Sequence, residues 1–182
     1  INECRVMQSL KESANVVAIE DYYMSEKADG IGFDIFMRME LLTPLTTYLE
    51  EHTVDEMMVA KLGSDICAAL DTCAGHNIIH RDIKPGNILV HKSGEFKLGD
   101  FGIARKVLNM TGALTNIGTP KYIAPELAKG NKYDERVDIY SLGIVMYELL
   151  NNGLIPFLPN KQIYIPDDKM EALRRRNDGE AI

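Results

Sequence analysis

The feature that most constrains this 182-residue chain is a stretch in which two short apolar runs alternate with polar loop residues. Residues 88–90 and 96–98 have the composition of short strands, and the residues between them favour a tight turn. Asp82, Asn87 and Asp100 lie beside or between these runs. The sequence therefore predicts a small hairpin with three polar side chains on its flanking loops.

These polar residues suit one kind of chemistry. Asn87 and Asp100 offer hard oxygen ligands, which favour Mg²⁺ over zinc. Asp82 can accept a proton from a nucleophile, and Lys84 can stabilise a phosphate oxygen as a point charge. Together they supply what phosphoryl transfer needs, because its catalysis depends mostly on positioning and electrostatics.

The N-terminal third has mixed periodicity. Residues 1–11 place apolar side chains at helical spacing, which predicts a helix. Residues 16–19 and 32–39 have the pattern of strands, separated by a turn at 28–30. Residues 40–44 interrupt the strand pattern, so we expect a connection there.

The remaining elements are predicted to be helices. Thr53 and Glu56 form a capping box for a helix that ends at Gly75, where a left-handed residue is favoured. Residues 137–150 are apolar nearly all round and predict a buried helix, and a short polar helix is expected near 168–176. The first helix has one apolar face, made of Val59, Leu62, Ile66, Ala69, Leu70 and Cys73.

Composition narrows the class of protein. Hydrophobic residues make up 46% of the chain, which indicates a globular domain, and the net charge of −7 argues against a nucleic-acid partner. Three cysteines without a CxxC pair indicate a reducing, cytoplasmic location, and Cys67 and Cys73 are expected to be buried. No apolar run approaches the roughly 20 residues that span a bilayer, so we expect no membrane contact here, although the parent protein could carry an anchor.

Three short motifs follow one another along the chain in an order that indicates a protein family. The run from His80 to Asn87, HRDIKPGN, resembles the catalytic loop of protein kinases. Asp100–Gly102 resembles their metal-binding motif, and Ala124–Glu126 resembles the motif that closes their activation segment, with Gly118–Pro120 between. Residues 151–159 are more similar to bacterial members of the family. The chain is therefore identified as a member of the protein kinase family.

The resemblance implies an α+β, protein-kinase-like fold that is only partly present. It covers residues 1–182 as one partial kinase domain. Residues 1–39 would be a remnant of the N-lobe, with helix C and strands 4 and 5. Residues 40–45 would be the hinge. Residues 46–182 would be most of the mainly helical C-lobe, ending after the region of helices F and G.

The family also implies a role for each site residue. Asp82 would be the base that deprotonates the substrate hydroxyl, and Lys84 is the choice of serine/threonine kinases. Asn87 and Asp100 would hold two Mg²⁺ ions, and Thr119 would hydrogen-bond near Asp82. The expected reaction moves the γ-phosphoryl group of ATP to Ser or Thr hydroxyls of protein substrates.

The resemblance extends to the nucleotide site. Met39 would be the gatekeeper, and the backbone of Glu40 and Leu42 would hydrogen-bond the adenine edge. Leu89 would lie under the adenine ring. Glu3 resembles the glutamate of helix C that pairs with a lysine of strand three.

Two parts of the family pattern are not among these 182 residues. The Gly-rich loop and the strand-three lysine would precede Glu3, so we expect ATP binding and turnover by these residues alone to be weak or absent. A pseudokinase-type binding module is one alternative, but intact Asp82, Asn87 and Asp100 speak against it. A small-molecule kinase is another, and the segment from Gly118 to Glu126 speaks against that one.

Other polar residues have structural explanations. In the family, the histidine at His80 packs against the phenylalanine at Phe101 and is tied to the aspartate at Asp138. We therefore expect Asp138 to hydrogen-bond loop backbone instead of doing chemistry. The three arginines at 174–176 are expected to form a solvated helix face.

The resemblance also predicts regulation. Arg81 would pair with a phosphate on the activation segment, residues 100–126, through charge-assisted hydrogen bonds. Thr115 is the expected autophosphorylation site, with Thr111 as a second candidate. Mass spectrometry of the active full-length kinase after incubation with ATP should find phosphate on Thr115. Active enzyme with unmodified Thr115 would contradict this hypothesis.

Overall fold

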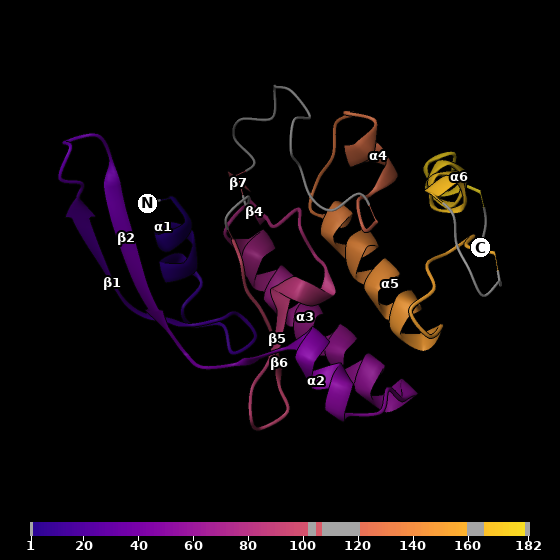
Figure 1. The fold of residues 1–182 in the computed structure, drawn as a ribbon, viewed down its shortest axis with the longest axis horizontal. Helices are drawn as coiled ribbons and strands as arrows, with labels where there is room; N and C mark the ends of the chain where they lie inside the picture. The colour runs from indigo at the N-terminus through magenta and orange to yellow at the C-terminus, as the bar shows by residue number, and fades with distance from the viewer. Residues whose placement is uncertain (1, 102–104, 107–120, 160–165, 181–182) are drawn as a thin grey trace.

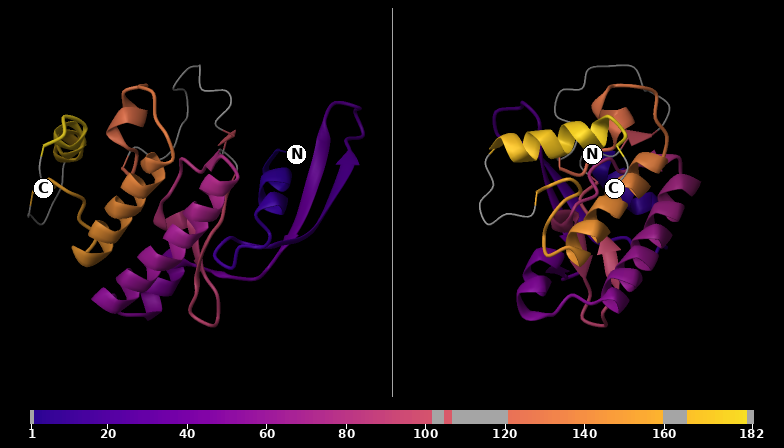
Figure 2. Two further views of the ribbon diagram at one scale, coloured as in Figure 1. Left: turned by 180° about the vertical axis from the view of Figure 1, so that it is seen from behind. Right: turned by 90° about the vertical axis from the view of Figure 1, so that its right-hand side faces the viewer.

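The structure, a computed structural model, describes residues 2–101, 105, 106, 121–159 and 166–180. A long two-stranded ribbon and a short helix lie on one side of a mainly helical body (Figure 1). The same division is visible from behind (Figure 2, left). Small antiparallel sheets beside packed helices make this an α+β fold, as predicted.

Helix α1 (Asn2–Ser9) and the strands β1 (Ile19–Glu26) and β2 (Phe33–Met39) form the N-terminal part. The two strands are antiparallel, with Ile19 opposite Met39 at the base of the hairpin. The helix and the second strand predicted for this region are confirmed.

The strand predicted over residues 16–19 is wrong in position, because the strand starts at Ile19. Val16 forms an isolated parallel bridge with Leu98, and the N–H of Val17 donates to the carbonyl of Leu98 at 2.9 Å. Both valines are buried. Their extended backbone is thus used in a contact with a segment about 80 residues later, which local periodicity does not report.

The central sheet has three short strands in the order β3, β5, β6. They are β3 (Thr43–Pro44), β5 (Ile88–Val90) and β6 (Phe96–Leu98), and neighbours are antiparallel. Gly94, in the turn between the last two, has a φ of 90°, a left-handed conformation that glycine adopts without a steric penalty. Both strands and the turn agree with the sequence prediction.

A second strand pair begins the loop that carries the polar residues. Strand β4 (Ile78–Ile79) pairs antiparallel with β7 (Arg105–Lys106). Residues 80–84 then have no regular secondary structure and lead through one 3₁₀ turn, η1 (Pro85–Asn87), into β5. The loop is therefore anchored at both ends by strands.

The helical body contains α2 (Leu45–Glu51), α3 (Glu56–Gly75) and α5 (Arg136–Leu150). α3 packs against α5. The two helices approach closely at Gly63, where an added Cβ would lie 2.8 Å from Cε of Met146. The buried face of α3 is the predicted one, with Gly63 added to Val59, Leu62, Ile66, Ala69, Leu70 and Cys73.

Helices α4 (Pro125–Ala128) and α6 (Pro166–Asn177) lie at the end of the molecule remote from the hairpin (Figure 1). They contact each other. The short polar helix expected near 168–176 is confirmed as α6. Within the part of the chain that the structure describes, no helix is long and apolar enough to cross a membrane.

Both ends of α3 differ from the prediction. The N-cap is Asp55 and not Thr53: its Oδ1 accepts a hydrogen bond from the N–H of Met58 at 2.7 Å. The helix ends at Gly75 as expected, but the left-handed residue that follows is Asn77, with a φ of 55°. Asn tolerates this region better than most residues because its short polar side chain bonds locally.

Two predictions of burial are wrong in part. Helix α5 buries one face, but Ile139 and Leu150 on another face are 49% and 50% exposed. Cys67 is exposed, because it lies outside the apolar face of α3. Cys73 is buried as expected, and burial raises the pKa of its thiol to about 12, which makes it unreactive.

The N-cap assignment can be tested by a pair of alanine variants. Asp55→Ala removes the acceptor for the Met58 amide and should lower the free energy of unfolding by about 1 kcal/mol. Thr53→Ala serves as the matched control and should change it by less than about 0.5 kcal/mol. Urea unfolding curves measure both. An equal loss of unfolding free energy in the two variants would instead support the capping box of Thr53 and Glu56.

Candidate active site

One buried carboxylate anchors the loop that follows β4. Asp138, near the start of α5, accepts a hydrogen bond from the N–H of His80 and another from the N–H of Arg81, each at 2.7 Å. All three residues are buried. Burial raises the pKa of the Asp138 carboxyl, and the two N–H groups oppose that rise. The prediction that Asp138 binds loop backbone is confirmed.

This anchor holds a strained backbone. Arg81 has a φ of 67°, in the left-handed region that costs a non-glycine residue about 1–2 kcal/mol. Such strain persists only where surrounding contacts determine the conformation. Here the bond from the Arg81 N–H to Asp138 is such a contact.

His80 connects the loop to the segment that carries Asp100. Its Nε2–H donates to the carbonyl of Gly99 at 2.9 Å, and its Nδ1 accepts from the N–H of Asp82 at 3.3 Å. Its ring meets the edge of Phe101, with centroids 4.7 Å apart. The expected packing of His80 on Phe101 is confirmed, and the hydrogen bonds define a neutral ring with the proton on Nε2.

The environment of His80 keeps it neutral. Burial lowers the pKa of the imidazole below its ordinary value, outweighing the carboxylates of Asp138, Asp82 and Asp100, which act in the opposite direction. Protonation at Nδ1 would also place two N–H groups against each other, since Asp82 donates to that atom. His80 is therefore a structural link and not a general base.

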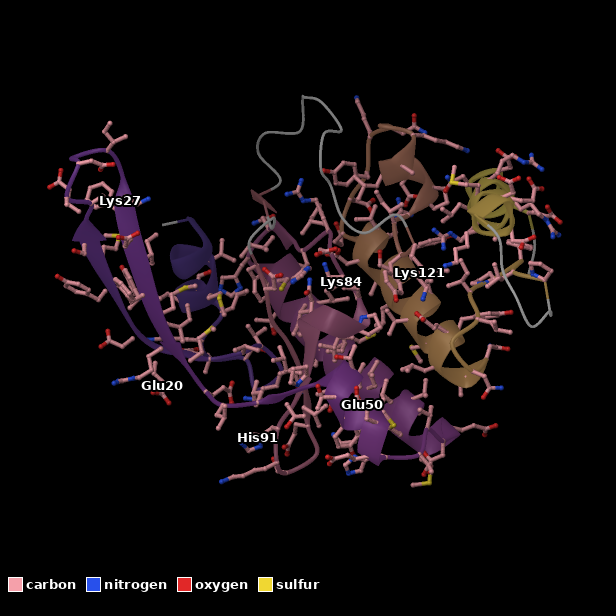
Figure 3. The ribbon with its side chains drawn as sticks, viewed as in Figure 1. Glu20, Lys27, Glu50, Lys84, His91 and Lys121 are labelled. Carbon is pink, nitrogen blue, oxygen red and sulfur yellow. The ribbon has the colours of Figure 1, made fainter. Side chains whose placement is uncertain are left out.

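The carboxylate of Asp82 is held by two neighbours on the same loop. Nζ of Lys84 lies 2.6 Å from its Oδ2. Nδ2 of Asn87 donates to the same Oδ2 at 3.0 Å and to the Asp82 carbonyl at 2.8 Å. The Asp82 side chain is 10% exposed, so it is oriented but still accessible from one side. Lys84 lies between α3 and α5 in the view of Figure 3.

Asp100 is brought next to Asn87 by a backbone contact. The N–H of Gly99 donates to the carbonyl of Asn87 at 2.9 Å, which joins the two loops one residue before Asp100. Asp100 has a φ of 56° and an exposed side chain. Because Nδ2 of the Asn87 side chain bonds to Asp82, the side-chain oxygen Oδ1 is the Asn87 atom left for a cation.

This donor set fits Mg²⁺ bound together with a nucleotide. Mg²⁺ typically takes one or two protein oxygens and completes its shell with waters and substrate phosphates. One carboxylate and one amide oxygen match that pattern. Among the residues described here, no three His, Cys, Asp or Glu side chains gather as a metal cage.

The residues expected to surround adenine belong to β2, β5 and the connection after β2. Leu89 is half-buried on β5, opposite both Pro44 and Lys97. A Cβ on Gly99 would come within 2.7 Å of Cδ1 of Leu89, so a larger residue there would require the Leu89 side chain to shift. Met39 ends β2 and is 44% exposed.

The connection after β2 is fixed by an ion pair that the sequence did not reveal. Nζ of Lys97 donates to both carboxylate oxygens of Glu40, at 2.8 and 2.9 Å. Oε1 of Glu40 also accepts from the N–H of Ala18 at 2.7 Å, and the N–H of Glu40 donates to the Ala18 carbonyl at 3.2 Å. Leu42, two residues later, packs against the core. The expected hinge is thus tied to β6.

Several predicted residues lie outside this description. Thr111, Thr115 and Thr119 are outside the described residues, and the described part of Glu3 is its backbone in α1. Arg81 is described: it is buried, and its Nε has no hydrogen-bond partner within the described segments.

A pocket of about 900 Å³ opens beside Lys84. Its walls include Tyr122 and Glu148, whose side chains are hydrogen-bonded to each other at 2.8 Å. Sequence reasoning missed both residues, because neither a tyrosine before α4 nor a glutamate near the end of α5 has a local pattern that marks it. The only signal for Tyr122 and Glu148 in the sequence was their spacing along the chain from the recognised motifs.

Comparison with known proteins identifies the family. The family model described as "Protein kinase domain" matches residues 1–178, so the chain belongs to the protein kinase family. It is 31% identical over 176 residues to serine/threonine-protein kinase shk2 of Schizosaccharomyces pombe, covering 95% of this chain and 28% of that protein.

Other relatives come from bacteria and plants. Serine/threonine-protein kinase PknB of Mycolicibacterium smegmatis is 40% identical over 124 residues, covering 63% of this chain and 20% of the relative. Serine/threonine-protein kinase TIO of Arabidopsis thaliana is 36% identical over 159 residues, covering 87% and 12%. Bacterial relatives are prominent, in line with the sequence prediction. The chain spans less than a third of the length of these relatives.

The buried neutral His80 predicts a pH dependence of stability. The folded pKa is below the unfolded value of about 6.5, so below that pH the unfolded state binds a proton that the folded state does not. Stability should therefore fall as pH drops through about 6.5, the pKa of histidine in the unfolded chain. Urea unfolding above and below this pH measures it.

Two variants isolate this contribution. His80→Gln should reduce the pH dependence of stability, while His76→Gln, at an exposed histidine, should keep the wild-type dependence. If His80→Gln retained the full dependence, His80 would not be the group responsible.

Proposed function

We propose that the protein transfers the γ-phosphoryl group of ATP to Ser or Thr hydroxyls of protein substrates. The observation that carries this proposal is the Asp82 carboxylate, held within 3.0 Å by Lys84 and Asn87 and joined through Gly99 to Asp100. Membership of the protein kinase family, and relatives named as serine/threonine kinases, support it.

In this proposal Asp82 is the base. Its carboxylate takes the proton of the substrate hydroxyl as the oxygen attacks the γ-phosphorus in line with the leaving ADP. Nζ of Lys84 lies 2.6 Å from the same carboxylate. From there its positive charge can stabilise the negative charge on the phosphate during transfer. Asn87 keeps the carboxylate in its orientation through the bond from Nδ2.

The oxygens of Asn87 and Asp100 would hold Mg²⁺, which when bound neutralises charge on the phosphates and aligns them. The adenine would lie over Leu89, with the backbone of Glu40 and Leu42 along its edge, beside the gatekeeper Met39. The Lys97–Glu40 ion pair supports this placement, because it fixes the hinge relative to the strand next to Leu89.

The other proposed roles rest on the family resemblance. Thr119 would hydrogen-bond near Asp82, and Glu3 would pair with the strand-three lysine. Thr115 or Thr111, once phosphorylated, would pair with Arg81, and the buried Nε of Arg81 supports a role in binding an anion. The 182 residues alone would turn over ATP weakly, so the full-length protein is the one to assay.

A pseudokinase-type binding module is the alternative. It would need the fold but not the orientation of the Asp82 carboxylate. The bonds that Lys84 and Asn87 make to that carboxylate favour an enzyme, since a binding module has no use for an oriented base.

An assay of the full-length protein with Mg-ATP and a generic protein substrate tests the proposal. Asp82→Asn keeps the size of the side chain but removes the base, and should lower the rate of phosphate transfer about 10²–10⁴-fold. Asp71→Asn, at an exposed aspartate of α3, is the matched control and should keep the wild-type rate. Equal rates in the two variants would reject Asp82 as the base, and no transfer by the wild type would favour the binding module.

A further inference from the structure

Three consecutive arginines on α6 have different surroundings. Arg174 is exposed and paired with Glu171 at 2.7 Å and with Asp178 at 2.9 Å, and Arg175 is paired with Glu180. Arg176, by contrast, is only 4% exposed. The predicted solvated face is therefore correct for the first two and wrong for Arg176.

The Arg176 guanidinium reaches the chain just before α4. Its Nη1 donates to the carbonyl of Lys121 at 2.5 Å, and its Nη2 lies 3.4 Å from the carbonyl of Ile123. Its charge lies near the ring of Tyr140 on α5, 5.9 Å from the centroid. One planar group thus spans two carbonyls that are two residues apart, which the fixed fork of an arginine permits.

The same short segment is held from its other side by α5. The hydroxyl of Tyr122 donates to Oε2 of Glu148 at 2.8 Å, and Lys121 forms an ion pair with the same carboxylate. Residues 121–123 are therefore fixed by side chain through Glu148 and by main chain through Arg176. Two different helices hold three consecutive residues.

This segment borders the proposed active site. Tyr122 and Glu148 line the pocket of about 900 Å³ that also includes Lys84, the partner of Asp82. A peptide lying in this pocket would therefore reach Asp82 past Lys84, whose Nζ is 2.6 Å from the Asp82 carboxylate.

Burying a guanidinium costs free energy, because the charge loses its hydration. If Arg176 served only to pack α6 against the body, an apolar side chain of similar size would do so without that cost. Burial lowers the pKa of Arg176, which shows the same cost of desolvation. The two carbonyls compensate for that cost, so the charge is best explained by what it holds.

We propose that Arg176 is a positioning residue for the protein substrate: it fixes the main chain of residues 121–123 as the wall of the substrate pocket. This inference rests on the proposed kinase function. It concerns a Ser- or Thr-bearing peptide segment and not the nucleotide.

Three variants of the full-length protein test the role. Arg176→Met removes the charge and the fork, and Arg176→Lys keeps the charge but loses the fork. Arg174→Met removes the same charge two residues earlier on α6, at an exposed site. Arg176→Met should raise KM for a protein substrate about tenfold or more, because hydrogen bonds to charged groups are among the stronger ones. Arg176→Lys should lie between it and the wild type, and Arg174→Met should match the wild type.

The slow hydrolysis of Mg-ATP by water separates positioning from general damage. It needs the catalytic loop and Asp100 but no peptide, so all three variants should retain the wild-type rate and the wild-type KM for ATP. A parallel loss of ATP hydrolysis and peptide phosphorylation in both Arg176 variants would overturn the inference in favour of a purely structural role. If Arg176→Met does not fold, Arg176→Lys carries the same comparison.

A second readout needs no kinase activity. Trypsin cleaves after Lys121, at the carbonyl that Arg176 holds. The folded protein is digested with trypsin under native conditions, and mass spectrometry measures the rate of cleavage after Lys121. This rate should be higher in Arg176→Met than in the wild type and unchanged in Arg174→Met. Equal cleavage in all proteins would reject the contact itself. Absence of phosphate transfer by the wild type would reject the proposed function while leaving this measurement decisive for the contact.

Discussion

The fold of the active-site loop depends on one buried carboxylate. Asp138 accepts N–H groups from two successive residues, His80 and Arg81, and so holds a left-handed backbone that would otherwise relax. Everything that follows in the loop, including the direction of Asp82, starts from that geometry. Asp138 belongs to α5, which packs against α3. The position of the loop relative to the helical body therefore depends on how these two helices pack.

From this anchor the contacts spread through backbone atoms. His80 bonds to the carbonyl of Gly99, and the N–H of Gly99 bonds to the carbonyl of Asn87. Residues with proposed chemical roles are therefore placed largely by backbone contacts with their neighbours. Glu40 and Lys97 do the same for the hinge, and Arg176 and Glu148 for the wall of the substrate pocket.

Local patterns predicted most regular elements and the catalytic loop. The apolar face of α3 and the strands β5 and β6 follow periodicities of a few residues, so a single segment contains the information. The predictions failed where a distant partner competes with local preference: Val16 and Val17 pair with Leu98 instead of extending β1. At α3 the start shifted by two residues, which made Asp55 the cap.

The sequence by itself determined the candidate chemistry: the types of Asp82, Lys84, Asn87 and Asp100 suit the proposed phosphoryl transfer, and their spacing resembles the motifs of protein kinases. Only the tertiary structure decided how they are held, since Asp138 is 56 residues from Asp82 along the chain and meets the loop through a helix. It also separated Arg176 from Arg174. Three identical side chains in a row carry no sign of which one is buried, because burial depends on the surface that the rest of the chain presents.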